Sequence, residues 1–138
     1  MTTDDEEAVS DVFWDVARRL RGLTRETVAP WEITPSQSRA LRVLNRYGEM
    51  RLSELSDYLR IAPRSTTEVV DALEVRGLVA RRPDPDDRRA TRVAATDDGA
   101  HVDGAIGIAR KAEAERFFED LSETDRAHLT RILRKLRA

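Results

Sequence analysis

The segment Arg81–Arg92, RRPDPDDRRATR, constrains the fold more than any other part of the chain. It holds five arginines, three aspartates and two prolines within twelve residues. On either side of it, in LVARR and ATRVAAT, the apolar spacing changes from helical to extended. Two extended runs around a turn rich in proline and aspartate predict a β-hairpin. The chain is therefore expected to carry a stiff, highly charged hairpin.

Helical spacing of apolar residues predicts the segments before the hairpin. A first helix is expected from Ala8 until Pro30 ends it. A second begins at ITPSQ, where Thr34 and Gln37 have the spacing of a capping box and proline occupies the first helical position. Gly48 is expected to close that helix with a left-handed residue. A short extended piece at 50–52 follows.

Two short helices stand directly before the hairpin. SELSDYLRIA predicts the first, and PRSTTEVVDALEVRG predicts the second, which begins at Pro63 and ends at Gly77. A tight turn between two short helices is the pattern of a helix-turn-helix. After the hairpin, one helix is expected over residues 97–119 and a last one from Ser122 to about Arg137. The fold class is mainly α with a small β-hairpin, in the order of a winged helix-turn-helix.

Composition excludes several classes of function. The chain has no cysteine, so thiol catalysis and disulfides are impossible, and His101 and His128 alone make a poor metal set. No Gly-rich phosphate loop and no clustered nucleophile, histidine and acid are present, so we expect no enzyme activity, no catalytic residues, no metal and no cofactor. No apolar run is long enough for a membrane span, and the acidic start is unlike a signal peptide. A cytoplasmic protein without a membrane partner is expected.

The distribution of charge is more informative than its total. The net charge of −2 argues against a nucleic-acid partner when it is considered alone. However, residues 1–30 carry four arginines against seven acids, whereas residues 31–97 carry twelve arginines against eleven acids. Any interpretation as a nucleic-acid binder must therefore depend on where individual arginines lie.

The chain resembles the MarR family of bacterial transcription regulators. The resemblance lies in ITPSQSRAL, in LSELSDYLRIAPRSTTEVVDALEVRGLVARRPDPDDRRATRVAAT, and in the closing LSETDRAHLTRILRKL. The most specific match is the hairpin tip, Asp-x-Arg followed by a small residue, which is Asp87 to Ala90 here. Three positions depart from the family pattern: Arg60 replaces a common glycine, Glu68 adds an acid, and Ala95 replaces a leucine.

The resemblance implies an architecture and partners. It implies a disordered acidic tail over 1–7, a dimerisation helix over 8–30, a winged DNA-binding region over 31–96 and C-terminal dimerisation helices over 97–138. The implied protein is a homodimeric repressor that binds a palindromic double-stranded DNA operator. Many members of the family also bind small aromatic or phenolic ligands, as anions, in a cleft between the dimerisation helices and the DNA-binding lobe.

The start of the helix at 63–76 is the first predicted DNA-binding site. In a helix-turn-helix, the N-terminal residues of the second helix meet base edges, and free N–H groups favour phosphates. Here those residues are Arg64, Ser65 and Thr67. Arg64 can bind guanine O6 and N7 with both arms of its guanidinium.

The hairpin tip is the second predicted site. Arg88 and Arg89 are expected to enter a minor groove, whose negative potential attracts arginine. We expect Asp87 to support them by holding an arginine fork extended. Arg81 and Arg82 are expected to be surface residues at the strand end, or at most phosphate contacts.

An alternative remains open. A winged helix can also be a protein-interaction module that does not bind DNA, and Glu68 together with the net acidity favours that interpretation. Salt dependence separates the two, because phosphate contacts weaken steeply as salt rises.

Overall fold

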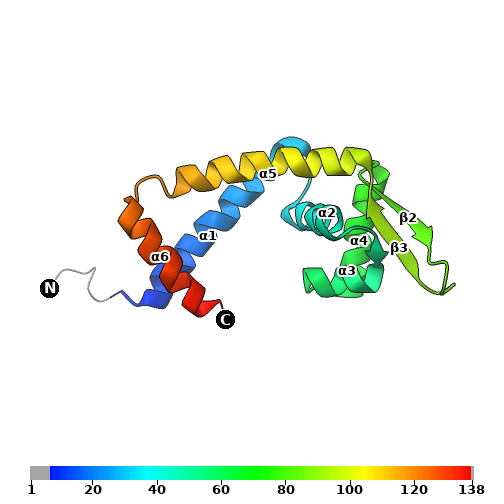
Figure 1. The fold of residues 1–138 in the computed structure, drawn as a ribbon, viewed down its shortest axis with the longest axis horizontal. Helices are drawn as coiled ribbons and strands as arrows, with labels where there is room; N and C mark the ends of the chain where they lie inside the picture. Colours follow the sequence, from blue (N-terminus) through cyan, green and yellow to red (C-terminus); the bar gives the residue numbers. More distant parts are fainter. Residues whose placement is uncertain (1–6, 138) are drawn as a thin grey trace.

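Within residues 7–137, which the computed structural model describes, the chain forms six α-helices, one 3-10 turn and three short strands. Figure 1 shows them arranged as an arch. Helix α5 (Asp97–Phe117) spans the top, and α1 (Val9–Val28) and α6 (Glu123–Leu136) form one end. The other end is a lobe of three helices and the sheet. This is the predicted fold class.

The lobe contains the predicted helix-turn-helix. The helices of the lobe are α2 (Pro35–Tyr47), α3 (Leu52–Leu59) and α4 (Pro63–Val75). The last two, α3 and α4, form the helix-turn-helix. The capping box of α2 is formed, because the N–H of Gln37 donates to Thr34 Oγ1 at 3.2 Å and the N–H of Thr34 donates to Gln37 Oε1 at 3.1 Å. Such reciprocal bonds satisfy two N–H groups that a helix start otherwise leaves free.

The predicted hairpin is formed by β2 (Val79–Pro83) and β3 (Thr91–Ala95). The extended piece before α3 becomes β1 (Met50–Arg51), which pairs with β3 and gives the antiparallel order β1-β3-β2. The register places Arg81 opposite Val93. Strand β1 pairs with Arg92 and Val93 of β3, so it joins the middle of the hairpin to the helical lobe.

One apolar core holds the lobe together. Its fully buried side chains come from all three lobe helices and both strands of the hairpin, and they include Leu41, Leu44, Leu55, Val70, Leu73, Val79 and Val93. A buried hydroxyl pair also joins α3 to α4, with Ser56 Oγ donating to Thr66 Oγ1 at 2.8 Å. This packing fixes the outward face of α4, because the opposite face is committed to the core.

The start of α5 is locked to the turn between α4 and β2. Thr96 Oγ1 accepts the N–H of Gly99 at 3.1 Å and donates to the carbonyl of Gly77 at 2.6 Å. A Cβ atom on Gly99 would lie 2.0 Å from the carbonyl oxygen of Leu78. Glycine is therefore required at this position, because the atom that a Cβ would meet belongs to the backbone of Leu78 and cannot rotate away.

The other end of the arch leaves its apolar side chains uncovered. In α1 the buried residue is Val28, and in the described part of α6 no residue is buried. Trp14 in α1 is 52% exposed and Leu136 in α6 is 72% exposed. Outside the lobe, one chain thus supplies little of the burial that amphipathic helices normally need.

Several boundaries differ from the prediction. Helix α4 ends at Val75 and not at Gly77, and α5 ends at Phe117 and not at residue 119. Helix α1 ends at Val28, and Pro30 lies in the following 3-10 turn, η2 (Ala29–Trp31). Gly48 has the expected positive φ of 83°, but its ψ of −170° is not left-handed helical. It turns the chain directly into β1.

Most of the predicted acidic tail, residues 1–6, lies outside the described residues, and Glu7 is exposed. None of the helices between residues 7 and 137 combines the length and the apolar character that a membrane crossing requires.

Candidate nucleic-acid interface

The N-terminal turn of α4 points its polar side chains away from the lobe. Because Thr66 and Val70 face the core, Arg64, Ser65 and Thr67 are exposed. The Arg64 side chain is 93% exposed, and its Nε lies 3.9 Å from Glu68 Oε1, one turn along the helix. A contact this long at the surface holds Arg64 only weakly. Its guanidinium is therefore free to bind another group.

Backbone groups at the same helix start are also available. Ala62 is the N-cap residue and provides no side-chain cap. Pro63 has no N–H, so the free donors of the first turn are the N–H groups of Arg64 and Ser65, which lie at the positive end of the helix dipole. Thr67 Oγ1 donates to the carbonyl of Pro63 at 3.1 Å, so its oxygen is left mainly as an acceptor. Together these groups suit an anion at the helix start.

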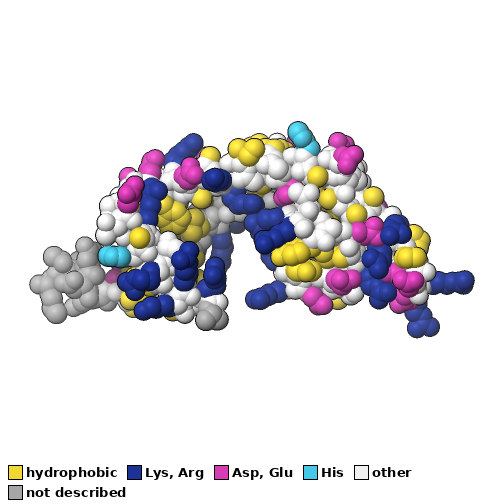
Figure 2. Space-filling model, in the orientation of Figure 1, with side chains coloured by type: hydrophobic (Ala, Val, Ile, Leu, Met, Phe, Trp, Pro, Cys, Tyr) yellow, Lys and Arg dark blue, Asp and Glu magenta, His cyan; other side chains and the backbone are white. Residues whose placement is uncertain are grey.

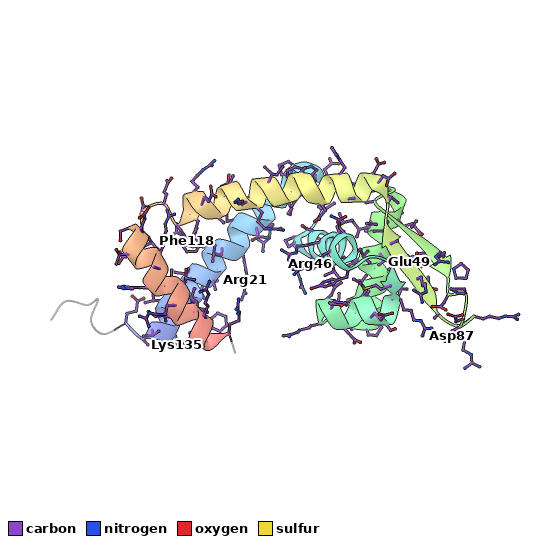
Figure 3. The ribbon with its side chains drawn as sticks, in the orientation of Figure 1. Arg21, Arg46, Glu49, Asp87, Phe118 and Lys135 are labelled. Atoms are coloured by element: carbon purple, nitrogen blue, oxygen red, sulfur yellow. The ribbon has the colours of Figure 1, made fainter. Side chains whose placement is uncertain are left out.

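The second cluster lies at the far end of the hairpin. Arg88 and Arg89 are exposed in the turn between β2 and β3. Figure 2 shows dark-blue basic side chains that project beyond the end of the hairpin, and Figure 3 places Asp87 at its tip. The tip thus presents two cations on a narrow support. That shape suits a groove better than a flat surface.

Asp84 organises this loop, although it was not among the predicted site residues. Its side chain is 0% exposed, and its Oδ2 accepts from Arg51 Nε at 2.9 Å and from Arg92 Nε at 2.8 Å. Its Oδ1 accepts the N–H groups of Asp86 at 2.8 Å and Asp87 at 3.1 Å. The N–H of Asp86, followed by the two guanidinium groups, holds the pKa of Asp84 well below its usual range.

A local signal for Asp84 was present in the sequence. Aspartate often accepts an N–H two residues further on and so forms a turn by itself. The contacts with Arg51 and Arg92 carried no such signal, because Arg51 is 33 residues away in the sequence and Arg92 lies on the other strand of the hairpin.

Asp87 supports the turn in a different way from the one expected. Its Oδ1 accepts the N–H of Arg89 at 3.0 Å, and its carbonyl oxygen accepts the N–H of Ala90 at 3.0 Å. Among residues 7–137, no ion pair joins its carboxylate to an arginine side chain. The expectation that Asp87 grips an arginine fork is therefore wrong. It fixes the backbone beneath Arg89.

Another exposed arginine, Arg60, lies in the turn between α3 and α4. Arg60 adopts φ 55° and ψ 43°, a left-handed conformation that favours glycine. The family pattern has a glycine at this position, and the backbone conformation here is the one that glycine adopts most easily. In this chain an arginine adopts it. Its side chain is exposed near the start of α4, as a basic group close to Arg64 in sequence.

A cavity of about 320 Å³ lies between α1, the turn η2 and α5. Its walls combine apolar and aromatic surface, including Leu23, Pro30 and Trp31, with the carboxylates of Glu26 and Glu113. Glu113 is paired with Arg116, whose Nη1 lies 3.1 Å from Glu113 Oε1. The cavity is therefore mainly apolar, with one of its two acids compensated by an arginine, and it touches both the arch end and the spanning helix.

Known proteins share this architecture. The family model described as the MarR family matches residues 33–91. The transcriptional repressor MdtR of Bacillus subtilis is 29% identical over 134 residues, which cover 95% of this chain and 86% of MdtR. The transcriptional regulator MhqR of the same organism is 30% identical over 104 residues, which cover 75% of this chain and 72% of MhqR.

Solved structures agree in fold. Apo MarR from Escherichia coli is 23% identical, with a TM-score of 0.85 that covers 94% of this chain and 96% of that one. A mutant of the same protein, complexed with operator DNA, is 23% identical, with a TM-score of 0.79 over 93% and 92% of the two chains. The arch with a lobe at one end is thus a fold that is also seen bound to DNA.

Proposed function

The chain belongs to the MarR family of transcription regulators, and from this membership we propose that it is a repressor that binds a palindromic operator as a homodimer. Helix α4 is proposed to lie in the major groove, and the hairpin tip to enter the neighbouring minor groove. The observation that carries the proposal is the presence of two exposed arginine groups, at the start of α4 and at the hairpin tip, on one rigid lobe.

The proposed contacts are divided between base reading and positioning. Arg64 and Ser65 are proposed to reach base edges or phosphates from the helix start, and Thr67 is proposed to offer an acceptor oxygen. Arg88 and Arg89 are proposed to bind in the minor groove, where narrow, A·T-rich DNA has the strongest negative potential. Asp87 and Asp84 are proposed to hold the tip so that its arginines are already oriented before binding.

The homodimer is supported by the uncovered apolar face at the end of the arch. Phe13 and Trp14 in α1 are exposed, as are Ile132 and Leu136 in α6. A second copy with the same face would bury these side chains on both partners by two-fold symmetry. We propose that residues 8–30 and 97–138 form this dimerisation region, with residues 31–96 as the DNA-binding lobe.

A small aromatic effector is proposed to occupy the cavity between α1, η2 and α5. Trp31 offers an aromatic face, whereas Glu26 and Glu113 disfavour an anion. A neutral or cationic aromatic compound therefore suits this cavity better than the phenolic anion expected from the family. Release requires that the effector bind more tightly to a dimer whose α4 helices are wrongly spaced for DNA.

The second candidate, an interaction module without DNA binding, is supported by the acids on α4. Glu68, Asp71 and Glu74 are all exposed on the helix that is proposed to face DNA. A mostly apolar protein interface would change little in affinity with salt. The response to salt therefore decides between the two candidates.

The test is fluorescence anisotropy of the protein on the DNA directly upstream of its own gene, at two salt concentrations. We expect tight, salt-sensitive binding that an unrelated duplex does not show. Arg89→Ala should weaken binding and reduce the salt slope by about one contact, with each phosphate contact contributing a slope of about −0.9. Weak and equal binding of both duplexes, with little salt response, would favour the interaction module.

A further inference from the structure

The exposed surface of α4 is acidic, which is unusual for a helix that is proposed to approach phosphates. Its outward side chains include one base, Arg64, and three acids, Glu68, Asp71 and Glu74. Uncompensated carboxylates next to a DNA backbone oppose binding, because the phosphate charges are closely spaced. Something must offset these acids if α4 enters a groove.

The compensating charge comes from the hairpin. Arg81 in β2 lies against α4, with its side chain only 25% exposed. Its Nη2 contacts Asp71 Oδ1, and its Nε lies 3.8 Å from Glu74 Oε1, too far for a hydrogen bond but within ion-pair range. Its backbone N–H also donates to Glu74 Oε2 at 3.0 Å. One arginine is thus shared by two acids of α4.

We propose that Arg81 is a positioning residue for DNA binding that acts as the counter-charge of α4. Its single positive charge offsets one of the two negative charges of Asp71 and Glu74, which favours the approach of the helix to phosphates, and it ties the hairpin to the helix. It does so without touching DNA. This inference depends on the proposed function, because it assumes that α4 faces DNA.

Arg82, the next residue of β2, does not share the ion pairs that Arg81 makes with α4. Successive strand residues point to opposite faces, so Arg82 points away from Arg81. Arg82 instead pairs with Glu49 near β1, with Nη2 at 2.6 Å from Oε1. Figure 3 places Glu49 beside the hairpin. The two arginines therefore have separate partners, and only Arg81 acts on α4.

A charge-rescue experiment tests the inference. Arg81→Met keeps most of the side-chain volume and removes the charge, and we expect it to weaken operator binding on the order of tenfold. Asp71→Asn with Glu74→Gln removes the two acids, and the amide introduced by Glu74→Gln would still offer an oxygen to the Arg81 N–H. The triple variant should recover affinity to within about threefold of the original protein. Binding is measured by anisotropy at two salt concentrations.

Arg116→Met is the matched control. It removes an arginine from another ion pair, with Glu113 in α5, and makes the same change in net charge. We expect less than about a twofold change in affinity, because surface charge far from DNA is screened. Thermal unfolding of every variant verifies that each one is folded.

The outcomes separate the inference from the function on which it rests. If Arg81→Met weakens binding and the neutral pair at 71 and 74 does not restore it, Arg81 acts through the strand or on DNA itself, and the inference is overturned. An unchanged affinity of Arg81→Met also overturns it, while the proposed function stands. If the unmodified protein binds no duplex, the proposed function fails and the inference fails with it.

Discussion

At the scale of single residues, the hairpin depends on a buried acid, Asp84, that lies beneath the exposed arginines of its tip. Asp84 joins three parts of the chain, since Arg51 precedes α3, Arg92 lies in β3, and the N–H groups of Asp86 and Asp87 belong to the loop. All four donors meet one carboxylate. A buried carboxylate with this many partners is well satisfied, and its loss leaves several donors without an acceptor.

Replacing Asp84 tests this role. Asp84→Asn keeps the size of the side chain but loses the charge that both guanidinium groups require, so we expect operator affinity to fall on the order of tenfold through a looser tip. Helix content, measured by circular dichroism, should stay unchanged. Asp86→Asn makes the same change in charge at an exposed neighbour and is expected to bind nearly normally. Equal losses in both variants would contradict this role.

The lowered pKa of Asp84 predicts how stability depends on pH. The N–H of Asp86 and the two arginines favour the ionised form in the folded state, so the folded pKa lies below the unfolded value of about 3.9. The stabilising contribution is complete above that value and is lost as pH falls through the folded pKa. In urea titrations, the difference in unfolding free energy between the original protein and Asp84→Asn should stay constant from about pH 7 to 5 and shrink below about pH 4. A difference unchanged at pH 3 would exclude this mechanism.

Substitution of Arg60 is expected to change protein stability and DNA affinity in opposite directions. Its left-handed backbone costs roughly 1 kcal/mol relative to glycine, so Arg60→Gly is expected to raise the free energy of unfolding by about that amount. If the exposed guanidinium touches a phosphate beside α4, the same change should weaken DNA binding and lower the salt slope by about one contact. Arg60→Ala, which loses the charge and keeps the strain, isolates the binding effect. Stability is measured by urea unfolding and affinity by anisotropy.

At the scale of elements, the sequence predicted the helix starts and turns that depend on residues close together in the chain. Thr34 and Gln37 identified the start of α2, Pro63 the start of α4, and the turn rich in proline and aspartate identified the hairpin. The contacts of Asp84 with Arg51, and of Arg81 with Asp71, were missed, because they join residues whose proximity depends on how the elements pack. The DNA-binding roles of Arg64, Ser65, Thr67, Arg88 and Arg89 remain predictions.

The junction between α5 and the lobe predicts a sharp effect at Gly99. A methyl group there would collide with the carbonyl oxygen of Leu78, which belongs to the backbone and cannot rotate away. We expect Gly99→Ala to lower the free energy of unfolding by about 2–3 kcal/mol, as overpacking does. Gly104→Ala is the matched control in the same helix, where an added Cβ meets no atom within 4 Å of the single chain. It should be neutral or stabilising by up to about 1 kcal/mol in urea unfolding.

At the scale of the whole molecule, the two ends of the arch differ in what they need. The lobe has a closed apolar core of its own, whereas α1 and α6 leave large apolar side chains in solvent. A second copy would complete the open end and leave the lobes free on the outside. Assembly would thus set the distance between the two α4 helices, which an operator with half-sites about one helical turn apart requires.

Disrupting the open end should therefore produce monomers. Leu136→Glu places a charge on the exposed apolar face of α6, and sedimentation equilibrium should shift from dimer to monomer because burying an unpaired charge is costly. Val75→Glu, on an 88% exposed residue of the lobe, should remain dimeric. The monomer should lose affinity for the full palindrome and bind a single half-site as before. A dimer that persists in Leu136→Glu would argue against this face.

Helix α5 connects the end of the arch that contains the cavity to the DNA-binding lobe that is proposed above. Its 21 residues extend for about 30 Å. The residues that line the cavity, Ala109 and Glu113, lie roughly 15–20 Å along the helix from Gly99. A tilt of about 10° at the cavity would move the lobe end of the helix by about 3 Å over that length. A displacement of that size is about the length of a hydrogen bond, so we expect a small molecule bound beside Trp31 to disturb the DNA contacts that are proposed for the hairpin tip.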